Sequence, residues 1–176
     1  MAFTDAKTKG NICSDALDTT ENCDAVLDDN GTADPSDDVI DFIAAPSGTR
    51  LPVTPKFKGA LTSRYSWPAW ADVKAHVQGA VSYQSSAPSS IRTEIELVGT
   101  HEHLNPNDFQ GRIRAATLVD LFAGLDWPKW NVELFGTNIF DKRNDISRFT
   151  ACGSCTRALV VPGRPRTIGI RAGMKF

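Results

Sequence analysis

The sequence lacks any long apolar run. No stretch of about 18 consecutive apolar residues occurs, and this absence excludes a transmembrane helix. Membrane-spanning β-strands need only ~9 to 11 residues of alternating character and escape that test. Residues 1–7 contain neither a basic nor an apolar segment, so the sequence as it stands predicts no secretion signal. We therefore expect either a cytosolic chain or one whose start lies further upstream.

Positive charge is absent from one long segment. Residues 11–49 contain ten Asp or Glu and no Lys or Arg, whereas the whole chain has a net charge of only -2. A segment of this kind is typical of a solvated loop. Residues 28–34 weakly resemble a calcium-binding loop, but they lack its alternating acidic register and its distal Glu. The sequence therefore predicts no metal site here.

No catalytic constellation stands out. The sequence offers no Ser-His-Asp arrangement, and its patterns place no pair of carboxylates on one convincing face. His101 and His103 could lie on one side of an extended segment, but no third metal ligand is evident, so we expect exposed histidines. A hydrolase would have to use these two residues. We predict a protein that is not an enzyme, has no cofactor and binds no nucleic acid.

Cysteines are few, and they form two close pairs. Cys13 lies near Cys23, and Cys152 lies near Cys155, each pair in a segment rich in small and polar residues. This favours two loop disulfides in an oxidising compartment. The second pair also matches the C-x-x-C pattern of redox sites, although no helical period follows it. A zinc site built from all four thiols is a further alternative, with spacings unlike those of a zinc ribbon or finger.

What the sequence does contain is a series of alternating segments. Apolar and polar residues alternate in residues 57–67, 73–83, 112–125, 130–140 and 167–176, and residues 2–9 resemble the end of a further strand. Two short turns, residues 67–72 and 126–130, divide the strands into hairpins. Residues 10–52, 85–111 and 141–164 are predicted loops. The predicted fold is all-β, an antiparallel up-and-down meander of about five strands and a stub.

All four tryptophans lie at the two short turns. Trp67 and Trp70 belong to the first turn and Trp127 and Trp130 to the second, each pair as Trp-Pro-x-Trp. Amphipathic indoles form a girdle at a membrane interface, beside the short turns of a barrel. This favours a segment of a transmembrane β-barrel with periplasmic turns and long extracellular loops. We assign the girdle to these four residues and Phe176.

The alternation gives each strand two faces. The predicted lipid-facing residues are Leu61, Tyr65, Val77, Val81, Val119, Leu121, Leu125, Ile168, Ile170 and Met174. The predicted lumen-facing residues are Lys58, Arg64, Lys74, His76, Arg112, Arg114, Asp120, Arg171 and Lys175. The basic members of this second set either guide an anionic ligand or pair with carboxylates nearby.

Five short segments, in order, resemble the TonB-dependent outer-membrane receptors. They are Ala-Phe-Thr-Asp-Ala at residues 2–6, Arg-Leu-Pro-Val-Thr-Pro-Lys-Phe at 50–57, Thr-Leu-Val-Asp-Leu at 117–121, Asn-Ile-Phe-Asp-Lys-Arg at 138–143, and the closing strand at 165–176. The resemblance is to the C-terminal part of the family's barrel, which has about 22 strands around a plug. The plug, the TonB-contacting box and most of those strands have no counterpart in this sequence.

The resemblance implies an outer-membrane location and a part in the uptake of a scarce nutrient, such as an iron-siderophore complex, cobalamin or a saccharide. The implied partners are outer-membrane lipid, the N-terminal barrel and plug of the same receptor, TonB acting through the plug, and the barrel-assembly machinery. Phe176 would be the assembly signal. The ligand-contact residues stay unassigned. We expect this polypeptide alone neither to transport a ligand nor to close a barrel.

A soluble extracytoplasmic β-sandwich that binds a ligand or partner is the alternative. Such a protein would pack its apolar strand faces inward. It would stay soluble without detergent, which distinguishes it from a barrel segment.

Overall fold

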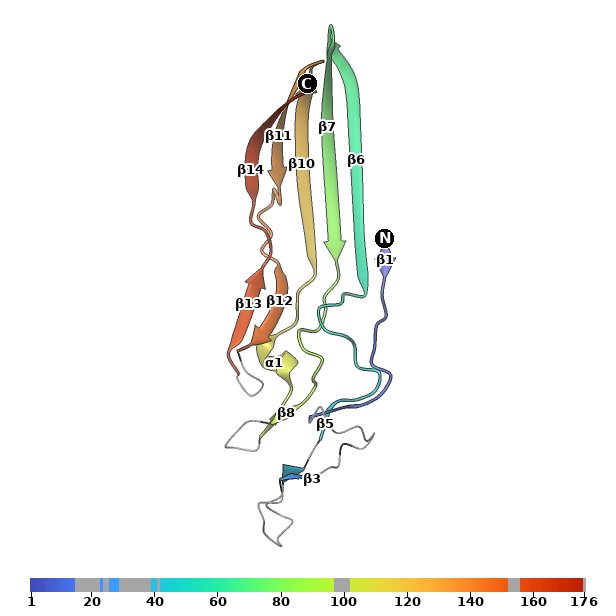
Figure 1. The fold of residues 1–176 in the computed structure, drawn as a ribbon, viewed down its shortest axis with the longest axis vertical. Helices are drawn as coiled ribbons and strands as arrows, with labels where there is room; N and C mark the ends of the chain where they lie inside the picture. The colour runs from blue at the N-terminus through green and yellow to red at the C-terminus, as the bar shows by residue number, and fades with distance from the viewer. Residues whose placement is uncertain are drawn as a thin grey trace.

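One antiparallel sheet dominates the molecule. The computed structural model describes residues 1–14, 23, 26–28, 39–40, 42–96, 102–151 and 156–175. The sheet has six strands in the order β1-β6-β7-β10-β11-β14 (Figure 1). Their bounds are β1 (Ala2–Phe3), β6 (Phe57–Trp70), β7 (Val73–Gln84), β10 (Ala116–Asp126), β11 (Trp130–Thr137) and β14 (Thr167–Met174). Each strand pairs antiparallel with its neighbour, which confirms the predicted all-β, antiparallel fold.

The turns between the long strands are tighter than predicted. Strand β6 continues through Pro68 to Trp70, and only Ala71 and Asp72 connect it to β7. The register of β6 shifts between Pro68 and Trp70. A bulge of this kind accommodates proline, which has no backbone N–H to donate to the neighbouring strand. The second turn is reduced to residues 127–129, because the Trp127 amide donates to the Trp130 carbonyl over 2.8 Å.

The other half of the molecule, which we call the loop half, contains the predicted loops (Figure 1). These segments are partly regular, with two-stranded sheets and a short helix. The elements are β2 (Ile12–Cys13), β3 (Val26–Asp28), β4 (Val39–Ile40), β5 (Ile43–Ala45), β8 (Ile95–Glu96), β9 (His103–Leu104), α1 (Pro106–Gln110), β12 (Asp145–Thr150) and β13 (Ala158–Pro162).

The segment predicted as a loop, residues 141–164, contains two strands. Strands β12 and β13 pair antiparallel there and extend the molecule beyond β11 and β14 (Figure 1). Strand β12 has little alternation to reveal it, because Asp145, Ser147 and Arg148 interrupt its apolar residues.

Several strand ends also differ from the prediction. Strand β10 begins at Ala116, four residues later than expected, because Ile113 turns away into the loop half. There Ile113 forms an isolated bridge with Ala87 and is buried. Strand β11 ends at Thr137 instead of continuing to residue 140.

Buried apolar side chains gather at the two ends of the molecule. Most lie in the loop half: Cys13, Cys23, Ala44, Ala45, Ala87, Ile95 and Ile113. At the turn end, Val73 and Ala75 are buried beside His76. No helix in the described part of the chain is long and apolar enough to cross a membrane. Between its two ends, the sheet leaves large apolar side chains in the open.

Candidate functional site

One face of the sheet is apolar and exposed. The register aligns Tyr65 with Val77, Val77 with Ala123, and Leu134 with Ile170, so these side chains share one face. We call it the apolar face. All ten residues predicted to face lipid have the parity of this face: Leu61, Tyr65, Val77, Val81, Val119, Leu121, Leu125, Ile168, Ile170 and Met174. Leu61 is 73% exposed and Ile170 is 71% exposed. Contact of this face with lipid stays a prediction.

The tryptophans gather at the turn end of the sheet. Trp127 stacks on Trp130 with ring centroids 3.7 Å apart, and Trp67 stacks on Tyr65 at 5.4 Å. Trp67, Trp127 and Trp130 line one apolar hollow between them, while Trp70 is 56% exposed. All four indoles lie at the turn end of the sheet, and their place at a membrane interface stays a prediction. Phe176, the fifth predicted member, lies outside the described residues.

The opposite face carries a chain of charged groups. His76 on β7 places its Nδ1 3.0 Å from Asp126 Oδ2 and its Nε2 3.1 Å from Glu133 Oε2. Arg64 Nη2 lies 3.8 Å from Asp126 Oδ2, and Arg171 Nε lies 2.8 Å from Glu133 Oε1. We call these five residues the charge cluster. They come from β6, β7, β10, β11 and β14, so the cluster crosses five adjacent strands.

The centre of the charge cluster is an enclosed imidazole. His76 is only 4% exposed, and both of its ring nitrogens face carboxylate oxygens. A neutral imidazole has one N–H and can donate to one of them, whereas the imidazolium donates to both. The charged form therefore satisfies both contacts. With His76 charged, three cations alternate with two carboxylates along the cluster.

Glycines provide the space for these groups. Gly124 pairs directly with His76 across the strands, and a Cβ on Gly124 would lie 2.5 Å from His76 Cε1 and 2.9 Å from the Val132 carbonyl. Gly169 leaves similar room for the Phe135 ring. The Arg171 guanidinium lies 5.0 Å from the centroid of that ring, within the range of cation–π attraction.

The predicted lumen-facing residues divide into three groups. Arg64, His76 and Arg171 belong to the charge cluster. Lys58, Lys74 and Asp120 share its face, which we call the polar face. The third group, Arg112, Arg114 and Lys175, lies just outside the strands, so the lumen-facing position of these three residues stays a prediction.

The sequence patterns missed the two carboxylates of the charge cluster. They predicted no pair of carboxylates on one face, but Asp126 and Glu133 flank His76 there. Both residues have the parity of the polar face on either side of the turn at residues 127–129. This shared position in the alternating pattern was the sequence signal that could have identified the two carboxylates. Of the two predicted roles for the basic residues, pairing with nearby carboxylates is the one observed for Arg64, His76 and Arg171.

Asn138 holds the junction between the sheet and the loop half. It is 3% exposed and adopts a positive φ of 49°. Its Nδ2 donates to the carbonyls of Lys142 and Arg164, and its backbone amide donates to Asp120 Oδ1 over 2.8 Å. The residue therefore joins the end of β11 to β10 and to the approach to β14.

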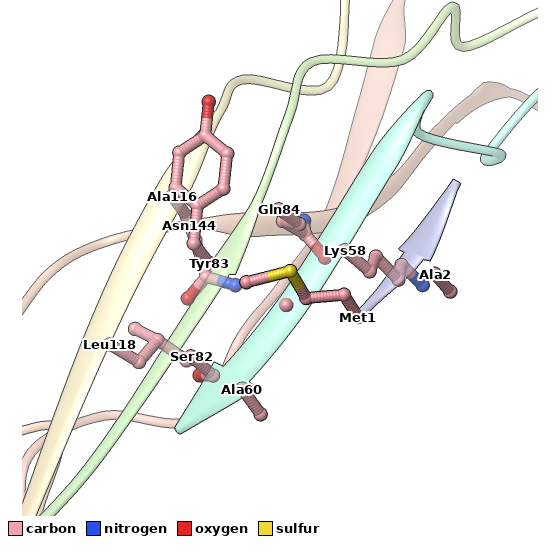
Figure 2. Close-up of a pocket in the computed structure, with 11 residues that line it drawn as sticks. Met1, Ala2, Lys58, Ala60, Ser82, Tyr83, Gln84, Ala116, Leu118 and Asn144 are labelled. Carbon is pink, nitrogen blue, oxygen red and sulfur yellow. The ribbon is translucent and has the colours of Figure 1, made fainter. Parts of the chain in front are cut away.

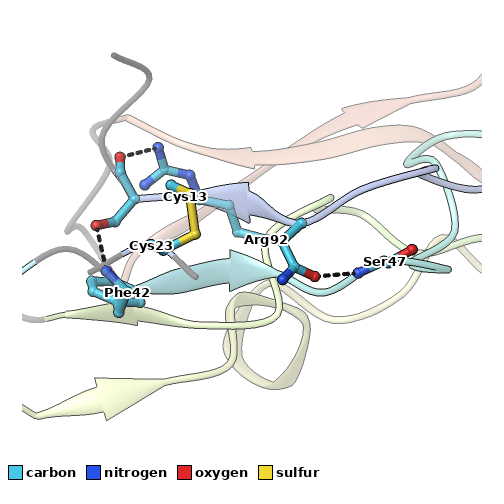
Figure 3. The surroundings of a disulfide bond; sticks show 7 residues. Cys13, Cys23, Phe42, Ser47 and Arg92 are labelled. Atoms are coloured by element: carbon cyan, nitrogen blue, oxygen red, sulfur yellow. Dashed lines mark hydrogen bonds between the residues drawn. A yellow bond between two sulfur atoms is a disulfide. The ribbon is translucent and has the colours of Figure 1, made fainter. Parts of the chain in front are cut away.

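One of the two predicted disulfides lies in the described residues. Cys13 and Cys23 are bonded, with Cα atoms 5.2 Å apart, and both are buried (Figure 3). Beside the bond, the Phe42 amide donates to Ser14 Oγ, and Arg92 donates to the Ser14 carbonyl. The alternative four-thiol zinc site is wrong, because this bond consumes two of its thiols. Cys152 and Cys155 lie outside the described residues.

The described residues provide no metal site. They contain no group of three or more His, Cys, Asp or Glu side chains placed to hold a metal ion. His103 pairs with Glu94 over 2.7 Å, while His101 lies outside the described residues, as does most of the calcium-like segment at 28–34.

A hollow of about 430 Å³ opens where the polar face meets the loop half (Figure 2). Ala60, Ser82 and Ala116 share the polar face and line it with short side chains, which leaves the space open. Met1 and Asn144 line it from outside these strands.

Comparisons of the chain with models of protein families, with curated proteins and with solved structures find no match. The geometry of the sheet and of its two faces therefore carries the functional argument.

Proposed function

We propose that this chain forms part of the wall of a transmembrane β-barrel in the outer membrane, as a portion of a TonB-dependent receptor that takes up a scarce nutrient. The observation that carries the proposal is the two-faced sheet. Large apolar side chains stand exposed on one face, and a chain of paired charges crosses the other. Lipid on one side and a polar lumen on the other would satisfy both faces.

Strand length supports a membrane setting. Strands β6, β7 and β10 have 14, 12 and 11 residues, respectively. A tilted membrane strand needs ~9 to 11 residues, whereas strands of water-soluble proteins have a mode of about 5 to 6. The three strands are therefore long enough to cross a bilayer.

The edges of the sheet support membership in a larger barrel. Among the described residues, β1 pairs only with β6, and β14 pairs only with β11. Unpaired backbone groups in a bilayer cost several kcal/mol each, so further strands on either side would stabilise these edges. In the proposed receptor, other barrel strands supply them, a plug meets the polar face, and the loop half faces outward to capture the ligand.

The proposal is tested by the depth of the tryptophans in a bilayer. The full chain, refolded in the presence of phosphatidylcholine vesicles, should show strong quenching of tryptophan fluorescence by lipids brominated near the headgroup. Bromine near the chain ends should quench less, because the indoles form an interfacial band. Vesicles without bromine are the control.

A soluble β-sandwich would behave differently. It would remain a monomer in water without detergent, unfold cooperatively, and give the same tryptophan emission with either brominated lipid. That result would refute the barrel proposal and favour the sandwich.

A further inference from the structure

A polar pocket lies in the loop half, away from the charge cluster. Three segments meet around a space of about 360 Å³, which is the size of a small-molecule site. We call it the loop pocket. Its lining residues are Thr49 and Arg50 before β6, Pro88, Ser90 and Thr93 after β7, and Asn105, Asn107, Asp108 and Arg112 around α1. Only Pro88 has a purely apolar side chain, so the pocket suits a polar ligand.

The walls of the loop pocket are fixed by hydrogen bonds between its segments. Asn107 Oδ1 accepts from the backbone amides of Ser89 and Ser90, at 3.0 and 3.3 Å. The Asn105 side chain caps α1 by accepting from the Asn107 amide over 2.9 Å. Because the walls are tied together without a ligand, a ligand would bind at little cost in ordering.

The charged groups of the loop pocket make few contacts with other residues of the protein. Arg112 makes no hydrogen bond or ion pair with any residue that the structure describes. Arg50 uses one nitrogen, Nη2, to donate to the Thr54 carbonyl. The Asp108 carboxylate also has no cationic partner within 4.0 Å among the described residues. Two guanidinium groups and one carboxylate are therefore free to meet a ligand.

We propose that the loop pocket binds a small polyhydroxylated carboxylate of the sugar-acid class. Guanidinium groups pair with carboxylates through two parallel hydrogen bonds, which assigns the ligand's carboxylate to Arg50 and Arg112. Asp108 accepts hydrogen bonds and suits the ligand's hydroxyl groups, whereas it repels a compact anion such as phosphate. Such a compound would be the ligand of the proposed receptor, so its biological setting rests on the proposed function.

The experiment measures binding of D-glucuronate to the full chain in detergent micelles by titration calorimetry. D-Glucose, which lacks the carboxylate, and acetate, which lacks the hydroxyls, should each bind at least about tenfold more weakly. Arg112→Gln should weaken glucuronate binding by about tenfold or more, since it removes a charged hydrogen-bonding partner. Arg143→Gln is the matched control, an exposed arginine outside the pocket, and should leave affinity unchanged.

Two results would overturn the assignment: no binding of glucuronate by the unmodified chain, or equal affinity in the Arg112→Gln and unmodified chains. The outcome is separable from the barrel proposal. Tryptophans at headgroup depth together with no glucuronate binding would refute only the ligand. Glucuronate binding without membrane insertion would refute only the barrel.

Discussion

At the scale of the residue, the charge cluster depends on Gly124, which has no side chain to collide with His76. Gly124→Ala should destabilise the protein by about 1 to 3 kcal/mol, because the new Cβ would lie 2.5 Å from the enclosed His76 ring and 2.9 Å from a backbone oxygen. Gly79→Ala is the control, since its Cβ would meet only Leu121, at 3.6 Å. Urea unfolding in detergent measures both. Equal midpoints for the two variants would contradict the packing around His76.

The two carboxylates of the charge cluster should contribute unequally. Glu133 is 15% exposed and contacts His76 and Arg171 at 3.1 and 2.8 Å, whereas Asp126 is 30% exposed and its arginine lies 3.8 Å away. Glu133→Gln should therefore cost about 1.5 to 3 kcal/mol, and Asp126→Asn clearly less. Asp72→Asn, in the exposed turn, is the control. The same unfolding assay measures both losses of stability. A larger loss for Asp126→Asn than for Glu133→Gln would contradict this order.

Side-chain parity was predictable from the sequence, but contacts between strands were not. Alternation alone placed Arg64, His76 and Arg171 on one face. The contacts of His76 with Asp126 and Glu133 depend on the register between strands, which the pattern within each strand leaves open. The space above Gly124 also depends on the register between strands, because it accommodates the His76 ring only where the two residues are aligned.

At the scale of the element, the two faces of β7 should respond differently to charge. Val77→Arg places a charge on the apolar face, where a membrane setting makes it cost about 2 to 4 kcal/mol near the bilayer midplane. Ala80→Arg, on the polar face opposite Asp120, should cost little. Partition of each variant between detergent and lipid vesicles checks the difference. Equal behaviour of the two variants would argue against lipid at the apolar face.

Long strands were predictable, and short elements of the loop half were not. Strands β6 and β7 follow uninterrupted alternation, which is a strong local signal. Strands β8 and β9 have two residues each, and their pairing brings Ile95 next to Leu104 from across a long connection. Such pairings arise from the packing of the loop half, which is absent from the local pattern.

At the scale of the whole molecule, the two halves differ in how their apolar side chains are covered. The loop half encloses its own small core, including Ala44 and Ile95, whereas the apolar face of the sheet lies open. In lipid vesicles, trypsin should cleave at exposed Lys142, Arg143 and Arg157 in the loop half. It should spare Lys74 and Arg171 in the sheet, since the bilayer would keep the protease away from the strands. Mass spectrometry of the fragments tests this, and early cleavage within the sheet would contradict the membrane setting.

The close approach of Gly124 to His76 also restricts how this protein can change over time. A side chain at position 124 fits only if residue 76 is smaller than histidine, and a smaller residue there leaves Asp126 and Glu133 without their shared partner. We expect positions 76 and 124 to be inherited together, as a histidine with a glycine, wherever both carboxylates are kept.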